Sequence, residues 1–135
     1  MKQIKFTKGY KYQLEELYFT QTDITGYDID TDFIQLSQDG ALVLRKGFAW
    51  DGPSGPTIDT PNFMRGSAEH DAFYKLMRME LLPLEEREKA DIRLKETCLE
   101  DGMSEFRAGI VFDAVRKFAS SAAEPKNKKE VFVVP

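Results

Sequence analysis

One cysteine, one histidine and one tryptophan occur among the 135 residues of this chain, which also lacks any long hydrophobic run. Because Cys98 is alone, the chain has no internal disulfide framework and no multi-cysteine metal site, so we expect folding to rest on packing. The apolar runs stay far below the ~18 residues of a membrane span, and the first residues lack the apolar segment of a secretory signal. We therefore expect no transmembrane segment and no export by that route.

The chain also lacks an excess of positive charge. It carries 19 Lys and Arg against 23 Asp and Glu, which leaves a formal net charge of −4. A polyanion is attracted by a basic surface, so this balance predicts no nucleic-acid partner. Nucleic-acid binding through the lysines of residues 126–129 is the least favoured interpretation.

Hydrophobic residues make up 41% of the chain, enough for one core. We expect a single α+β domain over residues 1–121, with a small antiparallel β-sheet in the N-terminal half followed by three packed α-helices. Residues that favour strands dominate from Phe6 to Trp50, and Asp39-Gly40 between two apolar runs predicts a hairpin. Residues 47–57 hold three Gly and two Pro, which predicts an ordered loop.

Three helices are predicted after this loop. Thr60 followed by Pro61 is typical of a helix start, so the first helix spans about 61–82 and the second about 84–100. Ser104 begins a third helix that runs to about 119, with an apolar stripe formed by Phe106, Ile110, Ala114 and Phe118. The charged residues 85–89 are expected to form a solvated helix face. Residues 122–135 are expected to be a polar linker and a strand-like tail at 131–134.

His70 is the residue on which the functional hypothesis depends. On a helical period it shares a face with mostly apolar residues, so the imidazole is expected to point inward and to need hydrogen-bond partners. Asp91 lies at an equally apolar position of the second helix, where an unpaired carboxylate costs several kcal/mol. Two antiparallel helices joined by a short turn face each other, so we expect a hydrogen bond between His70 and Asp91.

This pair has two interpretations. In the first, His70 and Asp91 form a buried polar clasp that sets the helix register, and Tyr74 adds a phenolic hydrogen bond. In the second, Asp91 orients the imidazole and fixes its tautomer, so that the other ring nitrogen acts as a general base on water or a hydroxyl, with Tyr74 as a helper.

The loop before the first helix supplies the other candidate residues. Asp51, Gly52, Ser54, Gly55 and Thr57 are expected to line a ligand or oxyanion site, because Asp-Gly and Gly-Pro steps can aim backbone N–H groups at an anion. Ser54 lies outside any Gly-x-Ser-x-Gly motif and is interpreted as a turn residue rather than a nucleophile. Asp71 either pairs with Lys75 one turn later or, with loop carbonyls and Asp51 or Asp59, binds Ca²⁺.

The loop Trp50-Asp51-Gly52-Pro53-Ser54, the helix motif His70-Asp71-x-x-Tyr74 and the pair Ala90-Asp91 resemble a phage and prophage family, domain-of-unknown-function family 1353. The resemblance covers about residues 33–118. It implies a bacteriophage gene product without a settled activity.

The same helix motif is similar to that of phospholipase A2, which implies a catalytic base at His70, a calcium-binding carboxylate at Asp71 and an orienting carboxylate at Asp91. The chain departs from that family elsewhere. Its disulfides are missing, and the cysteines that flank its helix motif are replaced by Glu69 and Phe73.

These observations predict a phage-encoded accessory or virion-associated protein with a His-Asp hydrolase-like site that cleaves esters or amides of host envelope material. The alternative is a structural or assembly protein of the virion, in which the His-Asp pair is a clasp and the C-terminal strand binds a partner. Expected partners are other virion proteins or host envelope components, and the expected location is the virion or the host cytoplasm.

Overall fold

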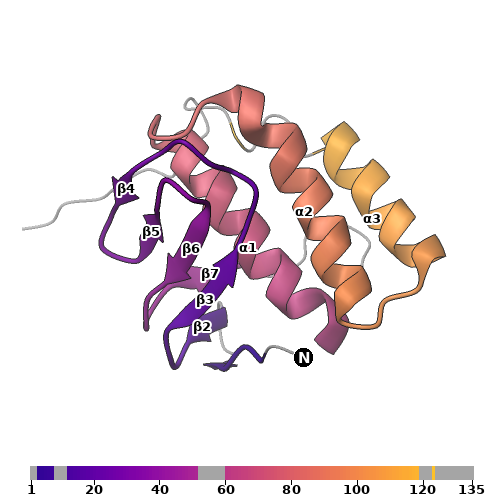
Figure 1. Ribbon diagram of the computed structural model, residues 1–135. Coiled ribbons are helices and arrows are strands. Elements are labelled where there is room, and N and C mark those ends of the chain that lie inside the picture. The colour runs from indigo at the N-terminus through magenta and orange to yellow at the C-terminus, as the bar shows by residue number, and fades with distance from the viewer. Residues whose placement is uncertain (1–2, 8–11, 52–59, 119–122, 124–135) are drawn as a thin grey trace, which may run out of the picture.

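The computed structural model describes residues 3–7, 12–51, 60–118 and 123. In these ranges seven short strands precede three α-helices, which confirms the predicted α+β class (Figure 1). The predicted polar linker and C-terminal strand, together with loop residues 52–59, lie outside the described residues.

All strand pairs are antiparallel and form two sheets rather than one. The first sheet has the order β1-β2-β7, with β1 (Phe6–Thr7), β2 (Tyr12–Leu14) and β7 (Ala49–Trp50). The second has the order β3-β6-β5-β4, with β3 (Tyr18–Gln21), β4 (Ile29–Asp30), β5 (Ile34–Leu36) and β6 (Ala41–Leu44). The backbone of Leu14 exchanges hydrogen bonds with Gly47 and Phe48, which extends the pairing of β2 with the segment that leads into β7.

The predicted hairpin joins β5 and β6. Gly40 adopts a φ of +89°, and the Asp39 carboxylate accepts a hydrogen bond from the Ala41 backbone N–H at 3.1 Å. A Cβ atom at Gly40 would lie 2.1 Å from the Thr22 carbonyl oxygen, so the turn admits only glycine without local rearrangement.

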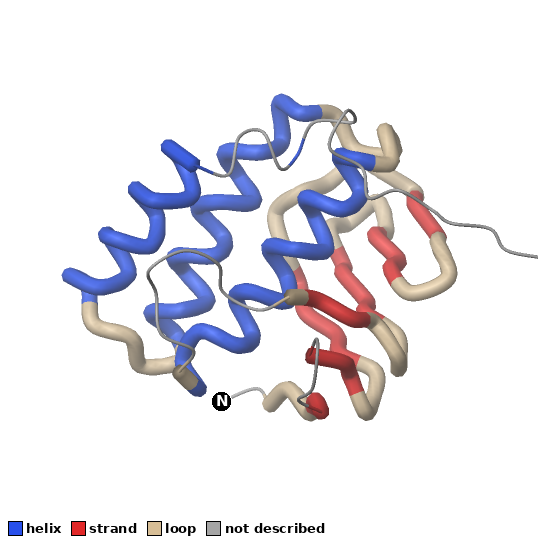
Figure 2. Tube along the Cα trace, turned by 180° about the vertical axis from the view of Figure 1, so that it is seen from behind, coloured by secondary structure: helices blue, strands red, loops and turns tan. Residues whose placement is uncertain are grey.

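Side chains alternate between the two faces of the sheets, and the inward set packs on α1 (Pro61–Arg78). Figures 1 and 2 both show α1 between the strands and α2 (Arg87–Glu100), with α3 (Glu105–Phe118) on the far side of α2. One apolar cluster fills the space between the strands and α1. A second lies among the helices and comprises Phe63, Leu94, Cys98, Met103, Ala108 and Val111.

The predicted first helix is too long. It ends at Arg78, because Glu80 takes a left-handed φ of 61° and the N–H groups of Leu81 and Leu82 both reach the Leu76 carbonyl. This turn buries Leu82, and Pro83 disfavours a helical residue before it. The next segment begins with one 3₁₀ turn, η1 (Leu84–Glu86), before α2.

The first two residues of the predicted apolar stripe of α3 do not face the core. Phe106 is 81% exposed and Ile110 50% exposed, while Ala108 and Val111 are buried. A helix that touches one neighbour buries only the stripe that faces that neighbour, and α3 packs chiefly on α2. The predicted start of α3 is confirmed, since the Ser104 hydroxyl accepts a hydrogen bond from the Arg107 N–H at 3.2 Å. At the start of α1, by contrast, the Thr60 side chain makes no cap hydrogen bond.

Candidate functional site

The predicted hydrogen bond between His70 and Asp91 is present. His70 Nε2 lies 2.7 Å from Asp91 Oδ1, and the carboxylate is fully buried. Helices α1 and α2 approach closely at Gly66, where an added Cβ would lie 3.0 Å from Leu94 Cδ1 and 3.1 Å from Cys98 Sγ. This close packing brings the imidazole of α1 within hydrogen-bond distance of the carboxylate of α2.

Both oxygens of Asp91 are hydrogen-bonded. Tyr74 donates its hydroxyl proton to Oδ1 at 2.6 Å, and Arg116 Nη1 donates to Oδ2 at 2.7 Å. Arg87 Nη2 lies 3.9 Å from Oδ2. Burial raises the pKa of Asp91, but the hydrogen bonds from His70, Tyr74 and Arg116 outweigh it, so the pKa lies below its ordinary value. Asp91 is therefore a carboxylate at neutral pH.

Tyr74 contacts both Asp91 and Arg87 through its hydroxyl. Its ring lies on the imidazole of His70, with centroids 4.2 Å apart, and the side chain is buried. Its hydroxyl donates to Asp91 and accepts a hydrogen bond from Arg87 Nε at 3.0 Å. Burial, followed by the hydrogen bond to Asp91, raises the pKa of Tyr74 well above its ordinary value, so the phenol keeps its proton.

The arginines of this site are absent from the sequence-based prediction. Arg87 lies in the segment 85–89 that is predicted to be a solvated face. Glu85, Glu88 and Lys89 are exposed, as predicted, but Glu86 is buried and the side chain of Arg87 is only 16% exposed. Arg116 comes from the last turn of α3. The one available signal is the spacing of Arg87 and Asp91, which places a cation and an anion four residues apart on α2.

The proposed calcium ligands are not brought together as a metal site within the part of the chain that the structure describes. No three His, Cys, Asp or Glu side chains lie there in an arrangement that could hold a metal ion. Asp51 is exposed and Asp71 is half-buried. The remaining loop candidates, Gly52, Ser54, Gly55 and Thr57, lie outside the described residues, so their role stays a prediction.

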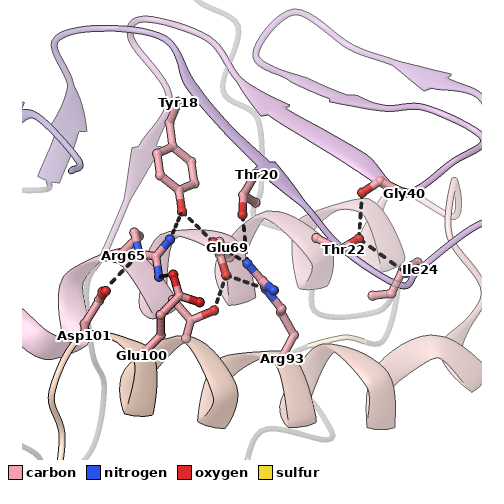
Figure 3. A network of polar contacts seen from close by, with 11 residues as sticks. Tyr18, Thr20, Thr22, Ile24, Gly40, Arg65, Glu69, Arg93, Glu100 and Asp101 are labelled. Carbon is pink, nitrogen blue, oxygen red and sulfur yellow. Dashed lines mark hydrogen bonds and ion pairs between the residues drawn. The ribbon is translucent and has the colours of Figure 1, made fainter. Parts of the chain in front are cut away.

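A second polar network surrounds Glu69, the neighbour of His70 in the sequence (Figure 3). The fully buried carboxylate of Glu69 accepts hydrogen bonds from Tyr18 at 2.6 Å, Thr97 at 2.8 Å and Arg93 at 3.1 Å. Arg93 also donates to the Thr20 hydroxyl at 2.8 Å. These contacts link β3, α1 and α2.

Arg65 extends this network to the C-terminal end of α2. It is 1% exposed and donates to Glu100 at 2.7 Å, to Asp101 at 3.0 Å and to the Tyr18 hydroxyl at 3.2 Å (Figure 3). Sequence reasoning missed this network, because its members are scattered over residues 18–101 and no spacing rule relates them.

Ser67 and Cys98 have structural roles. Ser67 accepts a hydrogen bond from Trp50 Nε1 at 3.0 Å and donates to the Met64 carbonyl at 2.9 Å, which anchors β7 on α1. Cys98 is buried, and burial raises the pKa of its thiol to about 12. This thiol stays protonated at neutral pH.

The chain was compared with family models, with curated proteins and with solved structures, and none of them matches it. The resemblances stated above therefore remain predictions. Among the described helices, none combines the length and the apolar character that crossing a bilayer requires. What the geometry itself defines is an oriented imidazole, a buried carboxylate that holds it, and two arginines around that carboxylate.

Proposed function

We propose that this chain is a hydrolase of esters or amides in which His70 is the general base. The observation that carries the proposal is the direction of the imidazole. An ionised carboxylate only accepts hydrogen bonds, so Nε2 carries the proton that it shares with Asp91. In the neutral ring Nδ1 then keeps its lone pair, which is the state of a general base.

Nδ1 is available for this role as far as the described residues extend. None of them forms a hydrogen bond with it, and the side chain of His70 is 12% exposed. The imidazole is also held on its face by Tyr74 and through Nε2 by Asp91. A base that is already oriented loses little conformational freedom when it takes a proton from water.

The proposed context is that of a bacteriophage accessory or virion-associated protein, located in the virion or the host cytoplasm. Its substrates would be lipid or cell-wall components of the host envelope, and backbone amides of the loop at 51–57 would stabilise the oxyanion. This context is supported by the sequence resemblance. Calcium at Asp71 belongs to the same proposal.

The second candidate is a structural or assembly protein in which the same residues form a clasp. The observation that favours it is the network around Glu69, which shows that this fold also uses buried ion pairs where no base is presented. Asp91 joins all three helices, since its partners come from α1, α2 and α3. In this reading the C-terminal strand at 131–134 binds a neighbouring virion protein.

Hydrolysis by matched variants separates the two candidates. The wild type, His70→Gln, Asp91→Asn and the exposed-site control Glu88→Gln are assayed on p-nitrophenyl esters and phospholipid vesicles, with calcium and with a chelator. We expect His70→Gln to remain folded and to reduce kcat/KM by about 10³-fold or more, whereas Glu88→Gln should have the kcat/KM of the wild type. Wild-type rates equal to buffer, together with a loss of stability in His70→Gln, would leave only the structural candidate.

A further inference from the structure

The cluster around Asp91 contains more positive charge than its carboxylate can neutralise. Arg116 Nη1 and Arg87 Nη2 lie 2.7 Å and 3.9 Å from the same oxygen, Oδ2. With the imidazole neutral, two positive charges face one negative charge. The whole chain has a net charge of −4, so this local excess of positive charge is opposite in sign to the net charge.

In the network around Glu69, carboxylates fully neutralise the charge of the arginines. There, Arg65 and Arg93 face the carboxylates of Glu69, Glu100 and Asp101, so acids outnumber bases (Figure 3). The side chain of Arg65 is 1% exposed. The arginines at Asp91 differ in both respects, because they are under-neutralised and their side chains are 16% and 31% exposed.

These two arginines also keep unused hydrogen-bond donors. Arg87 donates through Nε to Tyr74 and through Nη2 to the carbonyls of Val115 and Arg116, while no described residue accepts from its Nη1. Arg116 donates through Nη1 to Asp91, and within the described chain its Nε and Nη2 have no acceptor. Because a guanidinium carries five N–H donors, each group has donors left for a ligand.

Their fixed position favours binding. Arg87 is anchored on the last carbonyls of α3 and on Tyr74, and Arg116 is anchored on a buried carboxylate. A ligand that meets anchored donors does not have to order them. The planar fork of a guanidinium is suited to the paired oxygens of a phosphate or carboxylate.

We infer that Arg87 and Arg116 form an oxyanion-binding subsite next to His70, which selects substrates that carry a phosphate or carboxylate group. The subsite and the imidazole share one anchor, because His70 binds Oδ1 and Arg116 binds Oδ2 of the same carboxylate. The statement about substrates rests on the proposed hydrolase function. Binding of the anion does not depend on it.

A titration with inorganic phosphate tests the subsite. His70 is the only histidine, so the imidazole signals in a heteronuclear NMR spectrum report on this place alone. At pH 7 and constant ionic strength, we expect phosphate to shift these signals saturably in the wild type. Arg116→Gln is expected to weaken this binding about tenfold, the effect of one charge-assisted contact. Lys89→Gln, which removes an exposed charge from the other side of α2, should bind as the wild type does.

Two further results decide the inference. A wild-type signal that does not shift, or shifts equally with chloride, overturns the subsite. If Arg116→Gln does not fold, Arg116→Lys replaces it, because lysine keeps the charge and loses the planar fork. Phosphate affinity unchanged in Arg116→Lys overturns the assignment to the guanidinium, and a weaker affinity supports it.

Hydrolysis of two esters of matched length separates this inference from the proposed function. p-Nitrophenyl succinate ends in a carboxylate and p-nitrophenyl butyrate in a methyl group. We expect the wild type to have a higher kcat/KM for the succinate than for the butyrate. The ratio of the two values should fall in Arg116→Lys and stay unchanged in Lys89→Gln. Equal cleavage of both esters would overturn the substrate selection and leave the hydrolase intact. Phosphate binding without cleavage of either ester would keep the subsite and remove the hydrolase.

Discussion

Neighbouring residues of α1 serve two separate polar networks. Glu69 and His70 are about 100° apart around the helix, so their side chains leave it in different directions. Glu69 meets Tyr18, Arg93 and Thr97, while His70 meets Asp91. At the scale of single residues, the buried carboxylates of Glu69 and Asp91 are tolerated because both oxygens of each accept hydrogen bonds.

Replacing Glu69 tests this dependence. We expect Glu69→Ala to lower the free energy of unfolding by about 3–5 kcal/mol, because Arg93 loses the carboxylate that offsets its charge, and Tyr18 and Thr97 lose their acceptor. The exposed Glu96→Ala should change it by less than about 0.5 kcal/mol. Chemical denaturation followed by circular dichroism measures both. Equal, small effects would show that the network adds little to stability.

Short elements of this fold depend on single glycines. Gly40 and Gly26 both have positive φ values, +89° and +92°, but only Gly40 lies against another strand connection. The Thr22 N–H and hydroxyl both donate to the Gly40 carbonyl, at 2.9 Å and 2.8 Å (Figure 3). This contact holds the β5–β6 hairpin on the segment that follows β3.

Two alanine substitutions separate backbone strain from crowding at these turns. Gly26→Ala should cost about 1 kcal/mol, the cost of a left-handed alanine, because nothing lies within 4 Å of the added methyl group. Gly40→Ala should cost about 3 kcal/mol or more, because its methyl group would meet the Thr22 carbonyl at 2.1 Å. Thermal unfolding of both variants checks this order. Similar losses would mean that the hairpin shifts to accept the methyl group.

For the whole molecule, buried ion pairs make stability depend on pH. The pKa of Asp91 lies below its ordinary value in the folded state. As the pH is lowered, the carboxylate of Asp91 is therefore protonated in the unfolded chain at a higher pH than in the folded chain. The contribution of Asp91 is therefore complete above the ordinary carboxylate pKa of about 4 and is lost as the pH falls through the folded value.

We expect the free energy of unfolding of the wild type to decrease as the pH is lowered from about 4. In Asp91→Asn this free energy should decrease less steeply over the same pH range. Asp113→Asn, at an exposed position of α3, serves as the control and should follow the wild type. Urea denaturation at a series of pH values measures the slopes. An acid slope in Asp91→Asn that equals the wild-type slope would contradict the role of this carboxylate.

Local patterns of the sequence were sufficient for several features. The change from strand-favouring to helical periodicity near residue 60 determined the α+β class, and Asp39-Gly40 determined the hairpin. The inward positions of His70 and Asp91 on two helices joined by a short turn predicted their hydrogen bond. These features depend on neighbours in the chain or on one helix pair, where spacing translates directly into geometry.

Tertiary packing alone decided the rest. It left Phe106 on the surface and brought Arg116 from α3 to the carboxylate of Asp91. It also gathered Tyr18, Glu69 and Arg93 from three elements. No local pattern encodes these contacts, because they depend on how whole elements pack and on the need of each buried charge for a partner.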